Sequence, residues 1–133
     1  LAQIDGVHAL TDVTGFGVLG HTLELARGAE LTACIDSSQL PLLPGVRELA
    51  EQGIATGASG RNWASYGAHV ELGENVSDAM RALLTDPQTS GGLLVSCQPG
   101  AIQQVLETFK GHGFADACVI GRMQPGDAKV VVA

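Results

Sequence analysis

Residues 8–21, His-Ala-Leu-Thr-Asp-Val-Thr-Gly-Phe-Gly-Val-Leu-Gly-His, narrow the choice of folds more than any other part of the chain. Apolar alternation up to Val13 predicts a short strand, and Thr14 is a favourable N-cap for a following helix. Gly15 and Gly17 leave the first helical turn without side chains, so a phosphate group can approach the unpaired backbone N–H groups there. The segment therefore predicts a strand that turns into a helix, with a candidate phosphate-binding turn between them.

Asp12 lies beside this turn, where its negative charge is unfavourable for direct contact with a phosphate. A divalent cation between carboxylate and phosphate oxygens removes the conflict, because Mg²⁺ is commonly held by one or two carboxylates together with substrate phosphates. A structural explanation competes, in which Asp12 only stabilises the positive end of the helix, by under about 1 kcal/mol. Spacing alone leaves both explanations open.

A dinucleotide-binding fold is a further alternative. Gly15-Phe-Gly-Val-Leu-Gly20 matches the pattern G-x-G-x-x-G, and Asp36 closes the next apolar run, where such folds carry an acid for the ribose. The strand before these glycines is mostly apolar in dinucleotide folds, whereas Thr11, Asp12 and Thr14 make it polar here. A carboxylate fixed beside a pyrophosphate without metal is also unfavourable, so this alternative is the weaker one.

Composition indicates one globular domain, because the chain has 133 residues of which 45% are hydrophobic and 16% charged. The net charge of −7, with only seven scattered Lys and Arg residues, argues against a nucleic-acid surface. No apolar run approaches the roughly 18 residues of a membrane span. Cys34, Cys97 and Cys118 lie far apart in apolar runs, which predicts buried free thiols. We therefore expect a cytoplasmic domain that binds neither nucleic acid nor membrane.

The hydrophobic pattern along the chain predicts the α+β class, with a mixed β-sheet and helices packed on its faces. Residues 54–69 are the least regular part, and Trp63 and Tyr66 are spaced there to share one face of a helical turn. Arg61 and Asn62 in the same part are candidates to reach a ligand or a partner domain. Strands are predicted over 31–36, 70–72, 93–97, 118–121 and 129–133, the last two as a hairpin-like tail, and helices over 15–27, 46–52, 77–84 and from 99 to about 110.

A polar loop, Thr85-Asp-Pro-Gln-Thr-Ser-Gly-Gly92, runs directly into the predicted strand over 93–97. Pro87 holds Asp86 in an extended conformation. The adjacent Gly91 and Gly92 permit a positive φ or the close approach of another backbone. By itself the segment indicates an elaborate turn.

Taken together, residues 8–21 and 86–94, with Arg61-Asn-Trp-Ala-Ser-Tyr-Gly67 between them, resemble the C-terminal domain of the selenophosphate synthetases, also called selenide, water dikinases. The likeness runs over nearly the whole chain in matching order. A wider superfamily that includes aminoimidazole ribonucleotide synthetase shares the Thr-Gly-Phe-Gly neighbourhood, whereas Asp-Pro-Gln-Thr-Ser-Gly-Gly is typical of the selenium branch.

Members of this family make selenophosphate, AMP and phosphate from ATP, selenide and water, with magnesium. The resemblance implies that Asp12 is a Mg²⁺ ligand beside the ATP phosphates. It also implies that Thr11, Thr14, Gly15 and Gly17 shape the phosphate-facing turn. The loop residues expected at the active-site rim or a domain interface are Asp86, Gln88, Thr89, Ser90, Gly91 and Gly92.

The family's nucleophilic cysteine or selenocysteine, essential lysine and other magnesium-binding aspartates belong to an N-terminal domain that nothing in this chain resembles. The chain opens Leu-Ala-Gln-Ile-Asp without an initiator Met, so we expect part of a longer protein, with its own N-terminal domain as partner and a homodimeric assembly. The resemblance thus implies no catalytic residue here and a fragment that is inactive alone. Two alternatives stay open: another ATP-using member of the superfamily, of the purine-pathway cyclo-ligase type, and a standalone interaction domain.

Overall fold

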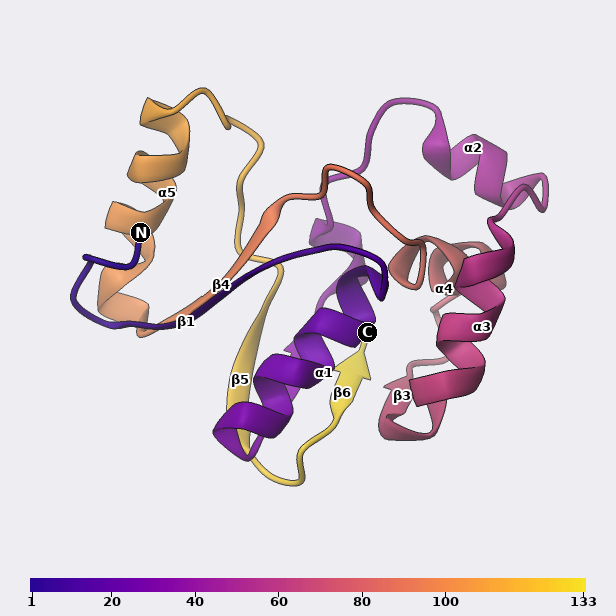
Figure 1. Cartoon of the computed structure of the whole chain (residues 1–133), viewed down its shortest axis with the longest axis horizontal. Coiled ribbons are helices and arrows are strands. Elements are labelled where there is room, and N and C mark those ends of the chain that lie inside the picture. Colours follow the sequence, from indigo (N-terminus) through magenta and orange to yellow (C-terminus); the bar gives the residue numbers. More distant parts are fainter.

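The computed structural model describes residues 1–133 and divides the six strands between two sheets (Figure 1). Strands β1 (Val7–Asp12) and β4 (Leu93–Cys97) form an antiparallel two-stranded ribbon. The other sheet is mixed and has the strand order β3-β6-β2-β5. Its strands are β2 (Leu31–Ile35), β3 (Val70–Leu72), β5 (Gly121–Pro125) and β6 (Val130–Val132). The predicted α+β class with a mixed sheet is confirmed.

Five α-helices surround these sheets, and most begin or end where the sequence predicts. Ser77 caps one of them as expected, because its hydroxyl accepts a hydrogen bond from the Met80 N–H at 3.1 Å. The helices are α1 (Gly17–Ala29), α2 (Val46–Glu51), α3 (Gly57–Tyr66), α4 (Asp78–Leu84) and α5 (Ile102–Gly111), with short 3₁₀ turns at Ser37–Gln39, Gly67–His69 and Pro99–Ala101. None of these helices is both long and apolar enough to cross a membrane.

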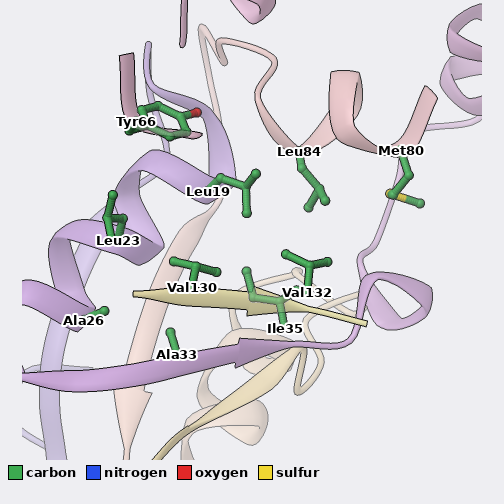
Figure 2. Close-up of a cluster of buried hydrophobic side chains, with 10 residues drawn as sticks. All are labelled: Leu19, Leu23, Ala26, Ala33, Ile35, Tyr66, Met80, Leu84, Val130 and Val132. Atoms are coloured by element: carbon green, nitrogen blue, oxygen red, sulfur yellow. The ribbon is translucent and has the colours of Figure 1, made fainter. Parts of the chain in front are cut away.

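The main core lies between α1, α4 and the mixed sheet, as Figure 2 shows. Leu19 and Leu23 point from α1 toward Val130 and Val132 of β6, and Leu84 reaches the same layer from α4. All five side chains are at most 1% exposed. This burial follows from the helical spacing of Leu19 and Leu23, which places both on one face of α1.

A second, smaller core joins α5 to the β1–β4 ribbon. Its buried members are Ile4, Ala101 and Val105, and Phe109 packs against them. In Figure 1 the helix α5 and the outer part of the ribbon lie to one side of α1 and the mixed sheet. The ribbon therefore connects two packing centres.

The tail is not a hairpin, contrary to the prediction, and its first strand covers residues 121–125 and not the predicted 118–121. Strand β6 runs parallel to β2 and β3 and lies between them, whereas β5 pairs antiparallel with the other edge of β2. The predicted hairpin failed because both segments find their partner in a strand that is distant in sequence. Cys118 is exposed, and Cys34 and Cys97 are half-buried, so the three free thiols are not the buried set expected.

The order of strands also excludes the dinucleotide-binding alternative. That fold requires the strand before the glycines and the strand after the helix to lie parallel in one sheet. Here β1 and β2 belong to different sheets. Asp36 accepts hydrogen bonds from the backbone N–H and the hydroxyl of Ser38, so its carboxylate caps a local turn.

Candidate functional site

The two sequence segments that carry the resemblance lie against each other. The end of β1 pairs with the start of β4, and the Val13 N–H continues this ladder by donating to the Gly92 carbonyl at 2.9 Å. A further hydrogen bond joins the glycine turn (residues 14–17) to the polar loop (residues 85–92), because the Gln88 N–H donates to the Thr14 carbonyl at 3.0 Å. The polar loop therefore packs directly against the glycine turn.

Two glycines permit this close contact. A Cβ atom on Gly91 would overlap the carbonyl oxygen of Val13. Gly17 has a φ of +69°, and a Cβ there would lie 2.9 Å from the Leu84 carbonyl oxygen and 2.8 Å from the carbonyl carbon of Thr85. A side chain at position 17 would therefore collide with the backbone at the end of α4, and the positive φ also favours glycine there. Only Gly15 has open space where a Cβ would lie, so of the two glycines in the turn it alone offers a bare surface to a ligand.

Helix α3 holds the glycine turn from the other side. Asn62 is buried, and its Nδ2 donates to the carbonyls of Gly15 at 2.8 Å and Thr85 at 2.9 Å. The Tyr66 hydroxyl donates to the Phe16 carbonyl at 2.6 Å. Asn62 therefore holds the chain in place and does not reach outward, which corrects its candidacy as a ligand contact.

Asp12 is exposed at the last position of β1, opposite Leu93. No protein group donates a hydrogen bond to its carboxylate. Helix α1 has Phe16 as its N-cap and makes no side-chain cap hydrogen bond, so Asp12 does not cap that helix end. No three His, Cys, Asp or Glu side chains gather closely enough to hold a metal ion. Asp12 is therefore a free carboxylate that can supply one ligand of a site.

Thr14 is not the N-cap of α1, contrary to the prediction, because the helix begins at Gly17. Its hydroxyl instead lies 3.0 Å from Nε2 of His21. The other ring nitrogen of His21, Nδ1, lies 3.0 Å from Oε2 of Glu24. The sequence analysis did not predict the bonds of His21 to Thr14 and Glu24. A signal was present for the second bond, because Glu24 follows His21 at the i,i+3 spacing that places both residues on one helix face.

The remaining loop residues divide into anchored and free side chains. Asp86 accepts a hydrogen bond from the hydroxyl of Thr56 at 2.9 Å, and the Gln88 amide donates to the Asp86 carbonyl at 3.2 Å. Thr89 and Ser90 are exposed and make no side-chain hydrogen bond. Thr11 donates to the Asp12 carbonyl at 3.3 Å. Asp86 therefore ties the loop to the start of α3, while Thr89 and Ser90 form the accessible rim.

The ribbon, the mixed sheet and the joined loops define a C-terminal domain of the AIR synthase type. The chain belongs to the family described as "AIR synthase related protein, C-terminal domain", which matches residues 1–133. Among solved structures it is similar to the hydrogenase maturation protein HypE of E. coli, with 26% identity and a TM-score of 0.70 over 98% of this chain and 32% of that one. Thiamine-monophosphate kinase of Stenotrophomonas maltophilia, at 20% identity over 96% of this chain and 31% of that one, shares the fold with a TM-score of 0.61.

Curated relatives are more similar in sequence. The chain is 70% identical to a selenide, water dikinase of Pseudomonas straminea over 132 residues, which is 99% of this chain and 37% of that protein. It is 60% identical to the selenide, water dikinase of Paraburkholderia xenovorans, again over 99% of this chain and 37% of that protein. The resemblance predicted from the sequence is confirmed. The chain spans a little over a third of the length of these relatives.

Proposed function

We propose that the chain is the C-terminal domain of an enzyme that makes selenophosphate, AMP and phosphate from selenide, ATP and water. The identity to selenide, water dikinases over almost the whole chain carries this proposal. The adjacent position of the glycine turn and the polar loop supports it, because residues from both segments then belong to one site. The same relatives favour this activity over that of a purine-pathway cyclo-ligase or of a standalone interaction domain.

In this proposal Asp12 is one ligand of a Mg²⁺ ion beside the ATP phosphates. The exposed carboxylate without a protein partner fits that role, and one carboxylate plus phosphate oxygens is a common arrangement for this ion. When bound, Mg²⁺ neutralises negative charge on the phosphates. Gly15 forms the bare part of the turn beyond Asp12, with Thr89 and Ser90 at the rim, whereas Thr11 precedes Asp12 in β1 and its side chain lies on the other face.

The remaining ligands and the reactive groups come from the N-terminal domain of the same protein, in a homodimeric enzyme. The contribution of an N-terminal domain rests on the length of the relatives, of which the chain matches 37%, whereas the homodimeric assembly rests only on the family resemblance. The domain contributes Asp12 and its turn and holds no catalytic residue of its own.

The substitution Asp12→Asn in the full-length protein tests the metal role. It removes the negative charge with almost no change in shape, so we expect selenide-dependent AMP formation to fall about a hundredfold or more, because metal stabilisation of phosphate charge is worth several kcal/mol. The exposed Asp116, which follows α5, provides the control substitution Asp116→Asn, expected to leave the rate unchanged. If the Asp12→Asn enzyme keeps its rate, the assignment of the metal ligand is wrong.

Titration of MgATP into the 133-residue chain tests the division of roles between the domains. A single carboxylate cannot hold ions that need several ligands, so we expect neither tight binding nor ATP hydrolysis. The full-length protein under the same conditions is the control and is expected to bind. Micromolar affinity of the isolated chain, measured by calorimetry, would contradict the proposal that the other ligands lie outside it.

A further inference from the structure

Three polar side chains form a continuous hydrogen-bonded series that ends at Thr14, two residues after Asp12 in the chain. Oε2 of Glu24 lies 3.0 Å from Nδ1 of His21, and Nε2 of His21 lies 3.0 Å from the hydroxyl of Thr14. The His21 residue is only 6% exposed, and its ring packs against that of Phe16 with the centroids 5.9 Å apart. Thr14, in contrast, is exposed. A buried, doubly bonded imidazole therefore holds the hydroxyl of a surface residue.

The protonation state of His21 decides the direction of the hydrogen bonds in the series. An ionised carboxylate only accepts, so Nδ1 of His21 must carry the proton in the bond to Glu24. In an imidazolium Nε2 would donate to Thr14, whereas in a neutral ring protonated at Nδ1 the Nε2 atom has a lone pair and no proton. In that neutral state the Thr14 hydroxyl donates its single proton to Nε2, and the outward side of Oγ1 presents only lone pairs.

The alternation of exposure over residues 12–14 indicates that the Thr14 side chain lies on the same face as Asp12. Asp12 and Thr14 are exposed, and Val13 between them is buried at 6% exposure. Val13 continues the β1–β4 ladder, and in an extended chain residues two apart share one face. With a neutral His21 ring, Thr14 thus offers a hydrogen-bond acceptor to whatever lies at the Asp12 site.

We propose that the His21 ring is neutral with its proton on Nδ1, that Glu24 and His21 are thereby positioning residues that fix Thr14 Oγ1 as an acceptor, and that the group it takes is a water molecule. Phosphate oxygens of a nucleotide carry no proton at neutral pH and would meet an acceptor unfavourably, whereas water donates. This gives Thr14 a role different from the phosphate contact that the sequence resemblance implies. The water as occupant rests on the proposed function, in which water is a substrate; the direction of the hydrogen bonds does not.

The protonation of His21 is measured directly by ¹⁵N NMR of the full-length protein labelled at histidine, in which the His21 signals are identified by their loss in the His21→Gln variant. At neutral pH we expect His21 to show a protonated Nδ1 and an unprotonated Nε2. Glu24→Ala should move the ring toward the other tautomer, whereas Glu48→Ala, on an exposed residue of α2, should not. A proton on Nε2 of the unsubstituted chain would overturn the proposal.

Kinetics of the full-length protein test whether Glu24 acts through Thr14. Thr14→Val and Glu24→Ala should each lower kcat about three- to tenfold with little change in the KM for ATP, as expected for loss of one positioned hydrogen bond. The double variant should be no slower than Thr14→Val, and Thr14→Ser, which keeps the hydroxyl, should recover most of the lost rate. Losses that multiply in the double variant would overturn the positioning role.

A crystal structure of the full-length protein with MgADP identifies the occupant. We expect an ordered water within hydrogen-bond distance of Thr14 Oγ1, and either a phosphate oxygen or a Mg²⁺ ion in direct contact with Oγ1 would overturn the proposal. Failure of the full-length protein to make selenophosphate would contradict the proposed function, whereas the NMR measurement would still decide the direction of the hydrogen bonds.

Discussion

At the scale of single residues, Tyr66 links the core to the candidate site. Its ring belongs to the main core, and its hydroxyl holds the Phe16 carbonyl at the start of α1. The residue is 7% exposed, and burial raises the pKa of its phenol to about 12 from a usual value of 10.0. Because it is the only tyrosine, its ionisation can be followed without interference from another phenol.

This pKa predicts a loss of stability in alkali. The neutral phenol is favoured in the folded state, so its contribution is complete below about pH 10, where neither state ionises. Between pH 10 and about pH 12 only the unfolded chain loses the proton, and the free energy of unfolding should fall by about 2–3 kcal/mol in all. Urea unfolding across this range measures the fall. Tyr66→Phe lacks the group, and an equal fall in that variant would show that Tyr66 is not its source.

At the scale of elements, the helices and strands that could be predicted are those marked by residues close together in the sequence, such as a capping residue or an apolar run. The capped helix α4, strand β4 and the Pro99-led helix α5 have the expected position and type. Residues 57–66 instead form helix α3, although Gly57 and Gly60 are poor helix formers. Tertiary hydrogen bonds from Asn62 and Tyr66 hold that helix, and a local pattern does not contain them.

The ends of helix α1 also differ from the predicted residues 15–27, and the difference at its C-terminal end can be tested by mutation. The helix continues through Gly28 to Ala29 and ends at Glu30, which has a φ of 55°. Gly28 has open space for a Cβ and no positive φ, so Gly28→Ala should raise the free energy of unfolding by up to about 1 kcal/mol. Gly45 also has open space but a φ of +83°, so Gly45→Ala should lower it by a similar amount. Chemical denaturation of both variants measures this; a same-sign change would refute the assigned backbone conformations.

At the scale of the whole molecule, the candidate site depends on a pairing that no local pattern reveals. Asp12 could be proposed as a ligand from the sequence, because its charge and the adjacent glycines suffice for that argument. The pairing of β1 with β4, which brings Gly91 and Gly92 beside Val13, joins segments far apart in the chain. The bond from Thr14 to His21 was likewise hidden, because it depends on where α1 begins.

The two packing centres differ in size, and this predicts where the molecule opens first. The core between α1, α4 and the mixed sheet has ten buried residues, whereas the one that holds α5 against the ribbon has three. Local opening requires less free energy where fewer apolar side chains are buried. Amides of α5 and the outer ribbon, residues 7–9 and 95–97, should therefore exchange with deuterium faster than those of β2 and β6. Tyr66→Phe should accelerate exchange in α1 and leave the relative exchange rates of the other segments unchanged. Equal protection of α5, the outer ribbon, β2 and β6 in the unsubstituted chain would show that the two centres open as one cooperative unit.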